Sequence, residues 1–471
     1  MLHISTRGEA QPLTFTDALL AGLARDGGLY VPEAWPSLAP DRIADFAGRP
    51  YAEVAKAVLG ALVGDEIPAV ELGRMVDEAY STFRHPAVCP LVQIGDNLFV
   101  QELFHGPTLA FKDVAMQLLG RLMDHVLAVR GQRATIVGAT SGDTGSAAVA
   151  AFAGSPRVDV FILYPHGRVS EVQRRQMTSV PDANVHAIAI DGTFDDAQAL
   201  VKAMFSNARF RDEMRLSGIN SINWARVAAQ AVYYFTAAVA LGAPHRQVSF
   251  SVPTGNFGNV LAGHVAKRMG LPVERLVVAT NANDILARTI ATGTYEVRGV
   301  IPTTSPSMDI QVSSNFERLL FEAYGRDAAS VRGLMASLAQ SRSFTVAPEP
   351  LAAIRRDFEA AAVPENEVAD EIGRTWREAG YLLDPHTAIG VRAARRHLAR
   401  APAVPVVALS TAHPAKFPDA VERATGIRPA LPPHLADLLE RPERVTRLPN
   451  DAAAIERFIR AEARAVTGRA A

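Results

Sequence analysis

The chain has 471 residues, more than one hydrophobic core usually organises, so we expect two or three domains. With 48% hydrophobic residues, 21% charged residues and a formal net charge of −1, the sequence indicates a globular protein and argues against a nucleic-acid partner or a membrane surface. The single cysteine, Cys89, excludes an internal disulfide framework and a thiolate metal cluster.

The first 90 residues are predicted to form a mainly helical segment (1–90) with turn-rich joins. Helical patterns occur in YAEVAKAVLGALVG (51–64) and in VELGRMVDEAYSTF (70–83). The N-terminus lacks a basic region followed by an apolar core, so no secretory signal is predicted. Because a single cysteine also fits a reducing compartment, we expect a cytoplasmic protein.

From about residue 91 short apolar runs alternate with helical stretches. Continuous apolar strands separated by helices are typical of parallel sheets that are covered on both faces, and their number predicts two such sheets. Ligands in these folds bind at the carboxyl ends of the strands. The expected strands are residues 134–139, 158–164, 185–190, 248–253, 275–280 and 404–411.

This order predicts an α/β protein with two parallel-sheet α/β domains. The large domain is expected to contain residues 91–130 and 220–428, with an elaboration at 281–380. The small α/β domain is expected at 131–219. Residues 429–471 are proline-rich and charged at their start, and we expect them to form a C-terminal extension without a site.

The longest apolar run, VAAQAVYYFTAAVALGA (227–243), is about long enough to approach a membrane span. It follows Arg226, contains Gln230 and stops at Pro244. Since nothing else in the chain is typical of a membrane protein, a buried helix is the favoured interpretation.

The first strand-to-helix turn is GATSGDTGSAAVAAFAG (138–154), in which an apolar strand leads into an alanine-rich helix. Such a turn can direct backbone N–H groups and hydroxyls at an anion, but it has neither P-loop nor dinucleotide-site spacing. A well-capped helix explains the pattern equally well. The polar side chains of this turn are Thr140, Ser141, Asp143 and Thr144.

The second turn is SVPTGNFGNVLAGHVAKRMG (251–270). Gly255 and Gly258 allow a tight backbone that can approach a ligand, and the following helix presents its N-terminal dipole. Two glycines with two amide side chains exceed what a helix cap requires, so a phosphate site is favoured here.

The third turn, ALSTAHPAKF (408–417), follows a strand that ends in Ser410 and Thr411. A hydroxyl here is placed to meet a ligand at the carboxyl edge of the sheet. An ordinary Ser/Thr turn is the alternative, and the pattern alone does not separate the two.

Lys112 lies in FHGPTLAFKDVAMQLLG (104–120), at the expected start of an amphipathic helix. The helix dipole disfavours an ammonium group there, and burial lowers the pKa of a lysine further. An amine tuned toward neutrality suits imine formation with an aldehyde. The alternative is a lysine whose stem packs on apolar neighbours while its head reaches water.

The chain resembles the threonine synthase family through blocks that occur in this order: FHGPTLAFKD, TSGDTGSA, NSINWAR, PTGNFGN, SMDIQVSSNFERLLFE, DPHTAIG and STAHPAKF. The resemblance runs from about residue 4 to 425, and the opening residues are similar to the N-terminal segment of the longer bacterial and fungal branch. It implies the tryptophan-synthase-β-like fold and pyridoxal 5′-phosphate as the cofactor.

By this resemblance Lys112 binds the cofactor aldehyde as a Schiff base, and Thr411 bonds the pyridine nitrogen. A neutral hydroxyl there, in place of a carboxylate, tempers the ring's pull on electrons. The loop implied to hold the cofactor phosphate consists of Gly255, Asn256, Phe257, Gly258 and Asn259.

Asp143 departs from the family pattern, because related enzymes commonly carry an asparagine that faces the 3′ oxygen of the cofactor. Two anions would repel each other at that place. Either a proton is shared between them or Asp143 points elsewhere, and both alternatives are open.

The implied substrate is O-phospho-L-homoserine, a small molecule with a carboxylate and a phosphate. Arg226 is the natural phosphate ligand, since a guanidinium offers a rigid, permanently charged fork; its alternative is a surface arginine at a helix start. The residues implied to bind the two anions, without a division between them, are Thr140, Ser141, Thr144, Asn220, Ser221 and Arg226.

The implied reaction is γ-elimination of phosphate followed by β-addition of water, in which Lys112 moves the α proton. A closed site is expected, because early hydrolysis would give a keto acid. A phospholyase or hydroxy-amino-acid dehydratase of the same fold would share Lys112 and the phosphate loop, and a non-catalytic descendant would keep only the cofactor. A monomer or a homodimer is expected.

Three histidines, His105, His386 and His413, lie in or beside these blocks. They lack metal-like spacing such as H-E-x-x-H, so no metal site is expected. We interpret them as hydrogen-bonding structural residues, with proton transfer as the alternative.

Overall fold

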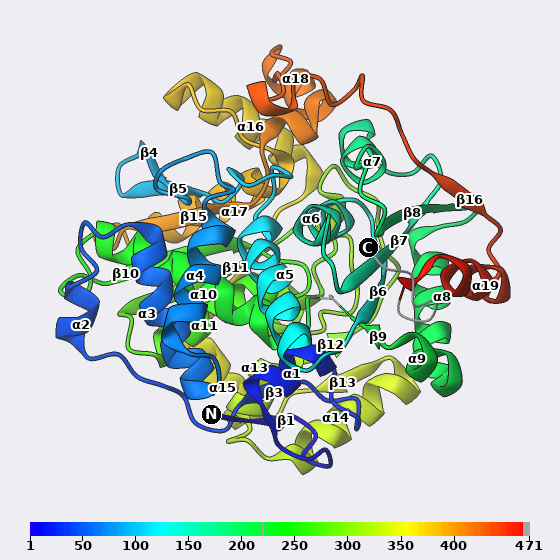
Figure 1. The fold of residues 1–471 in the computed structure, drawn as a ribbon. Coiled ribbons are helices and arrows are strands. Elements are labelled where there is room, and N and C mark those ends of the chain that lie inside the picture. Colours follow the sequence, from blue (N-terminus) through cyan, green and yellow to red (C-terminus); the bar gives the residue numbers. More distant parts are fainter. Residues whose placement is uncertain (219–220, 465–471) are drawn as a thin grey trace.

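The fold is described from a computed structural model, which covers residues 1–218 and 221–464. Two sheets of mainly parallel strands lie on either side of helix α5 (Lys112–Val129), which runs through the middle of the view in Figure 1. Side chains from both sheets and from α5 belong to one continuous hydrophobic core. The predicted α/β class with two parallel sheets is therefore confirmed.

The first sheet has six strands, and all neighbours are parallel except the edge pair β5 and β4. Successive residues point to opposite faces, so Leu276 and Val278 join one core while Val277 and Ala279 join another. In spatial order the strands are β14 (Phe358–Ala362), β11 (Val273–Thr280), β10 (Val248–Pro253), β15 (Val406–Ser410), β5 (Leu98–Glu102) and β4 (Leu91–Gly95).

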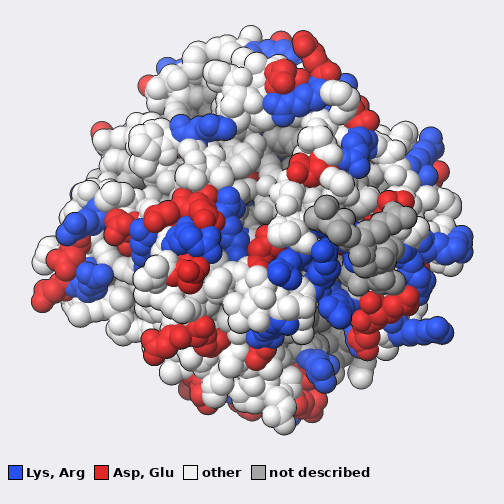
Figure 2. Space-filling view, in the orientation of Figure 1, with Lys and Arg blue, Asp and Glu red and all other residues white. Residues whose placement is uncertain are grey.

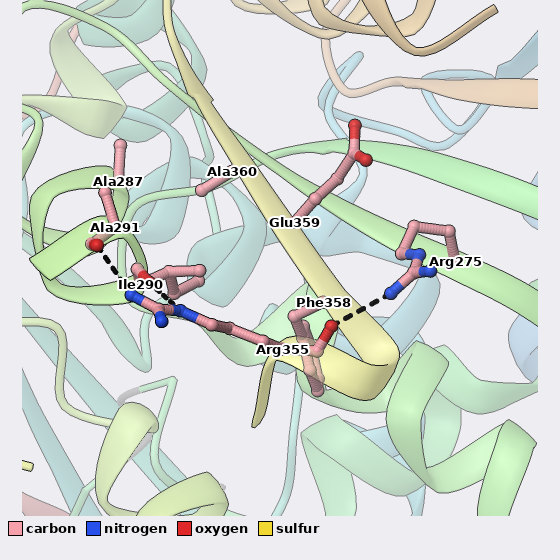
Figure 3. Close-up of a pocket in the computed structure, with 8 residues that line it drawn as sticks. All are labelled: Arg275, Ala287, Ile290, Ala291, Arg355, Phe358, Glu359 and Ala360. Atoms are coloured by element: carbon pink, nitrogen blue, oxygen red, sulfur yellow. Dashed lines mark hydrogen bonds between the residues drawn. The ribbon is translucent and has the colours of Figure 1, made fainter. Parts of the chain in front are cut away.

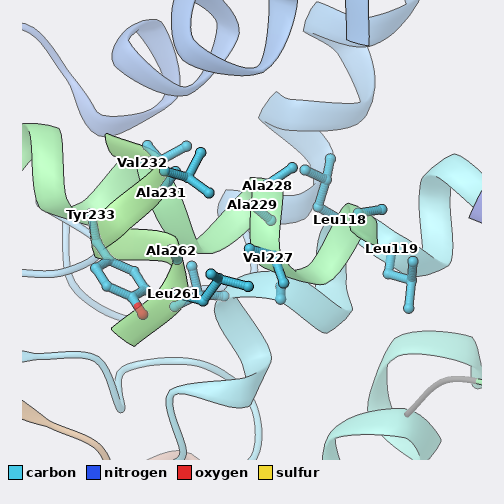
Figure 4. Close-up of a cluster of buried hydrophobic side chains, with 14 of the residues drawn as sticks. Leu118, Leu119, Val227, Ala228, Ala229, Ala231, Val232, Tyr233, Leu261 and Ala262 are labelled. Carbon is cyan, nitrogen blue, oxygen red and sulfur yellow. The ribbon is translucent and has the colours of Figure 1, made fainter. Parts of the chain in front are cut away.

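Helices cover both faces of this sheet. On one side α10 (Trp224–Ala240) packs against α11 (Gly258–Arg268), α5 and α3 (Tyr51–Val63). Figure 4 shows its alanines and valines between leucines of α5 and α11. The apolar run 227–243 is thus a buried helix, as predicted. The other face is covered by α17 (Pro385–Leu398), with α16 (Glu365–Ala379) packed on α17.

The second sheet is fully parallel and has five strands. Helices α6 (Asp143–Phe152) and α7 (Glu171–Thr178) lie on the side of α5, and α8 (Phe194–Ser206), α9 (Ala208–Met214) and α19 (Ala452–Glu462) lie on the other. In spatial order the strands are β16 (Thr446–Leu448), β8 (Val185–Ile190), β7 (Val158–Pro165), β6 (Ala134–Ala139) and β9 (Leu216–Ser217).

The C-terminal residues belong to this second sheet. Strand β16 pairs in parallel with β8, and Ile455 and Ile459 of α19 are fully buried in the core beneath it. The segment from residue 429, expected to be an extension, therefore supplies the edge strand of the second sheet. Its proline-rich sequence did not indicate this. The division of the chain into domains at the predicted boundaries stays a prediction.

The predicted strands after residue 130 coincide with β6, β7, β8, β10, β11 and β15 to within two residues at each end. The other strands were not predicted: β4, β5 and β14 have five residues each, and the rest have two to four, which are too few for a pattern. They include an antiparallel N-terminal sheet of β1 (Leu2–Ser5), β2 (Leu13–Thr14) and β3 (Tyr30–Pro32), and the pair β12 (Thr294–Glu296) and β13 (Ser343–Thr345).

The remaining helices surround these sheets. The N-terminal segment is mainly helical, as predicted. Outside α3, α5 to α11, α16, α17 and α19, the α-helices are α1 (Phe15–Ala21), α2 (Pro40–Ala44), α4 (Ala69–Tyr80), α12 (Ile285–Thr292), α13 (Phe316–Ala323), α14 (Ala328–Ser341), α15 (Pro348–Asp357) and α18 (Pro418–Thr425).

Among the described residues, no helix combines the length and the apolar character that crossing a membrane requires. On the face of the molecule shown in Figure 2, basic and acidic side chains lie interspersed.

The buried histidine His264 makes the stability of the folded chain depend on pH. Neither ring nitrogen of His264, on α11, has a hydrogen-bond partner among the described residues, and its ring lies 5.6 Å from that of Phe358. Burial lowers the pKa of His264 to about 4. The unfolded chain, with an ordinary pKa, therefore binds a proton between about pH 4 and pH 6.5 that the folded chain does not bind.

We expect His264→Phe to reduce the sensitivity of this protein to acid. At pH 5 the wild type should lose about 1–2 kcal/mol of unfolding free energy through this group, and the variant should not. Urea unfolding at pH 7.5 and pH 5, with the exposed His245→Phe as a matched control, measures the difference. An equal loss for wild type and His264→Phe would mean that other groups cause the acid sensitivity.

Candidate active site

Lys112 is the first residue of α5, as predicted, and the chain before it is fixed to the first sheet. The Phe111 N–H donates to the Thr411 carbonyl at 2.9 Å, just beyond the end of β15. The Asp113 carboxylate accepts from the backbone N–H of Thr108 at 2.8 Å and from its hydroxyl at 2.7 Å. These bonds place the lysine at the carboxyl edge of the first sheet.

The Lys112 ammonium is buried and lies 3.3 Å from Oδ2 of Asp143, at the start of α6. Burial lowers the pKa of Lys112; the nearby cations Lys416 and Arg226 lower it further, and Asp143 opposes the shift. The predicted direction is confirmed, and burial is its main cause. An amine of this kind loses its proton more readily than an exposed lysine, which suits attack on an aldehyde.

Asp143 points toward the lysine and not away from it. Its oxygens also accept from the Gln173 amide at 2.9 Å and from the Ser307 hydroxyl at 3.2 Å, and Oδ1 lies 2.7 Å from Nζ of Lys416. Burial disfavours the carboxylate, but Lys416 and Lys112 together hold the pKa of Asp143 well below its usual range. Asp143 is therefore an anion between two lysines.

The predicted phosphate loop connects β10 to α11. Gly258 begins the helix, and Phe257, which precedes it, has no side-chain hydrogen bond to the helix N-terminus. Within this loop Phe257 has a positive φ of 64°, whereas Gly255 and Gly258 do not. Asn256 is exposed, and its carbonyl accepts from the backbone N–H and the side-chain amide of Asn315 at 3.1 and 2.9 Å. The Val260 N–H donates to Asn259 Oδ1 at 3.0 Å, so the N–H groups of Gly258 and Asn259 are the ones that an anion at this helix start would meet.

A single segment joins this loop to the lysine. Ser307 donates through its hydroxyl to Asp143, and its carbonyl oxygen lies only 2.8 Å from where a Cβ on Gly255 would lie. The hydroxyl of Ser313, in the same segment, donates to the carbonyl of Gly255 at 2.7 Å. The sequence singled out this segment as a block but assigned no residue in it a function, so Ser307 and Ser313 were missed.

The residues present fit pyridoxal phosphate. The buried amine of Lys112 could bond to the aldehyde, and the glycine loop at the N-terminus of α11 could bind the phosphate. Three cationic side chains, Lys112, Lys416 and Arg226, are buried here, and Lys416 and Arg226 both lie near enough to Lys112 to lower its pKa. Buried cations favour ligands that are anions.

Thr411, the residue implied for the pyridine nitrogen, is held by its backbone. Its N–H donates to the Thr387 hydroxyl at 3.2 Å, and Thr387 donates in turn to the buried carboxylate of Asp384. The residue lies immediately after β15 and is 5% exposed. This position at the carboxyl edge of the sheet agrees with the implied function, which stays a prediction.

The residues implied for the substrate lie around the same lysine, with different environments. The Thr140 hydroxyl accepts from the N–H groups of Gly142 and Gly145, both at 2.9 Å, so it stabilises the turn itself. Ser141 and Thr144 are half-buried. Arg226, in the first turn of α10, is buried, and burial lowers its pKa to about 10. It is therefore not the surface arginine of the alternative interpretation.

Two further residues implied for the substrate, Asn220 and Ser221, precede α10. The carbonyl of Ser221 accepts from the Asn315 amide at 3.1 Å, which joins it to the phosphate loop. Asn220 lies outside the described residues. Substrate binding by all of these residues stays a prediction.

The three histidines are hydrogen-bonded, as predicted. His105 Nε2 lies 2.7 Å from Glu102, and His386 Nδ1 lies 2.9 Å from Asp384. His413 Nδ1 accepts from the backbone N–H of Ala415 at 3.1 Å. Within the described ranges no group of three or more histidine, cysteine or acidic side chains is placed to hold a metal.

Lys416 is the most prominent residue that the sequence analysis missed. It is fully buried in a short 3-10 helix, η3 (Pro414–Lys416), directly after the third turn. Its apolar neighbours in PAKF were a clue, because they resemble those of Lys112 in AFKD. Only the fold shows that both amines reach the same carboxylate.

A cavity of about 390 Å³ lies apart from these residues, beside β14 (Figure 3). Its two arginines are already engaged by backbone carbonyls: Arg275 by that of Arg355, and Arg355 by that of Ile290. None of the residues predicted for the site lines it. Its lining therefore gives no reason to assign it a ligand.

Gly255→Val is expected to weaken cofactor binding by about 10- to 100-fold, the range for forcing a larger side chain into a packed place. Its Cβ would lie 2.8 Å from the Ser307 carbonyl oxygen. Gly258→Val should also weaken binding, although its Cβ has ordinary contacts of 3.5 Å or more, because its branches would lie at the helix N-terminus. Absorbance titration of cofactor-depleted protein measures the affinity. The exposed Gly299→Val is the control, and normal affinity in both variants would place the phosphate elsewhere.

Comparison with known proteins agrees with this geometry. Three family models match: threonine synthase N terminus over residues 2–80, pyridoxal-phosphate dependent enzyme over 88–336, and threonine synthase, C-terminal over 387–459. The threonine synthase of Pseudomonas aeruginosa is 54% identical over 460 residues, which cover 98% of each chain.

Solved structures give the same result. A threonine synthase from Brucella melitensis, described as bound to PLP, is 61% identical with a TM-score of 0.96, and the match covers 98% of this chain and 100% of that one. The threonine synthase from yeast is 38% identical with a TM-score of 0.92 over 98% of each chain. The chain belongs to the threonine synthase family of pyridoxal-phosphate-dependent enzymes.

Proposed function

We propose that this enzyme converts O-phospho-L-homoserine and water to L-threonine and phosphate, with pyridoxal 5′-phosphate bound at Lys112. The observation that carries the proposal is the position of Lys112. It is a buried amine at the carboxyl edge of the first sheet, joined through Asp143 and Ser307 to a glycine loop at a helix N-terminus. Membership of the threonine synthase family supports the choice of substrate.

Each part of the cofactor has a residue to receive it. Lys112 would hold the aldehyde, Thr411 the pyridine nitrogen, and the loop from Gly255 to Asn259 the phosphate. When bound, pyridoxal phosphate supplies an electron sink that stabilises negative charge on the carbon atoms next to the substrate amine.

Lys112 is the group that moves protons. Its lowered pKa makes the neutral amine accessible, so it can take the proton from Cα of the substrate. Loss of a Cβ proton then breaks the Cγ–O bond and releases phosphate. Water adds at Cβ, and protons return to Cα and Cγ. The net change is one water consumed and one phosphate released.

The substrate anions are met by the cationic side of the site. Arg226 is proposed to pair with the phosphate, and Ser141 and Thr144 at the N-terminus of α6 to bind the carboxylate or the phosphate. Burial strengthens these interactions and keeps water from the reacting carbons. Helix α6 packs on the second sheet, whereas the segment before Lys112 is bonded to the first sheet. Movement of the two sheets toward each other would therefore close the site around the substrate.

Product analysis tests the proposal directly. The purified holoenzyme with O-phospho-L-homoserine should release threonine and phosphate in equal amounts. Release of a keto acid and ammonia would instead identify a phospholyase or dehydratase, and no turnover would identify a descendant that only binds the cofactor. We further propose that the enzyme acts in the cytoplasm as a monomer or a homodimer.

A further inference from the structure

The Asp143 carboxylate has two ammonium partners, and they are not equivalent. Lys416 Nζ lies 2.7 Å from Oδ1, and Lys112 Nζ lies 3.3 Å from Oδ2. Lys416 is fully buried and also donates to the Thr108 carbonyl at 2.8 Å, so its head group is held from two sides. Nothing in the reaction described above uses Lys416.

Only one of these two ammonium groups can remain paired with Asp143 when the cofactor is bound. Lys112 gives up its free ammonium when its nitrogen bonds to the aldehyde. The aldehyde carbon and the 3′ oxygen are attached to neighbouring carbons of the pyridine ring. A carboxylate that touches Lys112 is therefore within reach of that oxygen, which is itself anionic or strongly hydrogen-bonding.

We propose that Lys416 is the permanent counter-ion of Asp143, a positioning residue that keeps the carboxylate neutralised beside the cofactor once the nitrogen of Lys112 has bonded to the aldehyde and its remaining proton would be shared with the 3′ oxygen. The Asp143–Lys416 pair thus presents no net charge where related enzymes commonly have the neutral amide of asparagine. This inference rests on the proposed binding of pyridoxal phosphate at Lys112. It also explains how an aspartate can lie beside the 3′ oxygen without sharing a proton with it and without pointing elsewhere.

The two single variants should then behave in opposite ways. In cofactor-free Lys416→Met, Asp143 still has Lys112, and the Thr108 carbonyl still accepts from Gln176 at 3.0 Å, so the fold is retained. With cofactor bound, the nitrogen of Lys112 would be part of a C=N bond whose proton the 3′ oxygen shares, so the buried carboxylate would be left without a counter-ion. The affinity for pyridoxal phosphate should fall by about 30-fold or more, the usual loss when one partner of a buried charge pair is removed.

Asp143→Asn should have the reverse effect. It leaves two ammonium groups facing each other in the cofactor-free protein, which lowers the thermal unfolding midpoint of that form. Cofactor binding relieves this repulsion, so the affinity for pyridoxal phosphate should not fall. With cofactor bound, the double variant Asp143→Asn with Lys416→Met has neither an unpaired carboxylate nor an unpaired ammonium at these positions, and it should bind the cofactor within about threefold of the wild type.

The experiment is a double-mutant cycle with two readouts: the dissociation constant for pyridoxal phosphate and the unfolding midpoint of the cofactor-free protein. Lys267 and Asp357, also 2.7 Å apart but more exposed, give a matched control cycle in which cofactor affinity should not change. If Lys416→Met lowers both readouts and Asp143→Asn does not rescue it, Lys416 is only a structural residue and the inference is wrong. A wild type that fails to bind pyridoxal phosphate would instead refute the proposed function.

Discussion

Alanine at position 112 is expected to give a folded protein whose kcat/KM for O-phospho-L-homoserine is lower by at least about 10²- to 10⁴-fold, the range for removing a group that moves a proton. The fold should survive, because alanine is the best helix former and the residue begins α5. Asp143 also keeps Lys416 as a partner at 2.7 Å, so the change leaves no buried carboxylate unpaired.

Chemical labelling locates the reactive amine independently of activity. Borohydride reduces a C=N bond between a lysine and the cofactor aldehyde to a stable amine, and peptide mapping of wild type should find the label on Lys112. Lys112→Ala should carry no label, and Lys267→Ala, whose lysine pairs with Asp357, should be labelled like the wild type. A label on Lys416, the other buried lysine of the site, would show that the two amines have been assigned the wrong way round.

Arg226→Ala is expected to separate substrate binding from cofactor binding. Arg226 is buried close enough to Lys112 to lower its pKa, whereas the cofactor phosphate has its own loop at residues 255–259. The variant should therefore keep the absorbance of bound cofactor. Its kcat/KM for O-phospho-L-homoserine should fall by a factor worth about 2–5 kcal/mol, the range for removing one partner of a buried charge pair.

A comparison of two substrates makes this test specific. An unphosphorylated analogue has no dianion to pair with Arg226, so its loss in the variant should be smaller. Lysine at position 226 should restore only part of the activity, because a point charge cannot reproduce a bidentate fork. Equal losses on both substrates would mean that Arg226 supports the fold or the cofactor and does not bind the phosphate.

The sequence predicted most of the frame that carries the site. Long strands such as 158–164 and 248–253 are buried on both faces, so nearly every residue is apolar or small and the pattern is strong; the exception, Asp159, is paired with Arg464. Lys112 at a helix start followed from the stripe of apolar residues after it. The positions of long strands and helices depend mainly on residues that are close in sequence, so the sequence pattern is enough to predict them.

What the sequence did not predict depends on contacts between distant residues. Lys416 and Asp143 are 273 positions apart, and no periodicity relates them. Strand β16 was missed because its three residues carry no alternation, and it forms only against the edge of β8. The positive φ at Phe257 likewise depends on the path of the loop between β10 and α11, and a phenylalanine gives no signal for it in the sequence.

The pairing of β16 with β8 has a consequence for how the chain folds during synthesis. Strands β6, β7 and β8 emerge from the ribosome more than 250 residues before their edge partner, since β8 ends at Ile190 and β16 begins at Thr446. Until then the edge of β8 has no strand beside it, and the core that receives Ile455 and Ile459 lacks part of its cover. Exposed edges of this kind favour pairing with other chains. A nascent chain that stalls before residue 446 would therefore be a substrate for chaperones, even though its active-site segments had all been made.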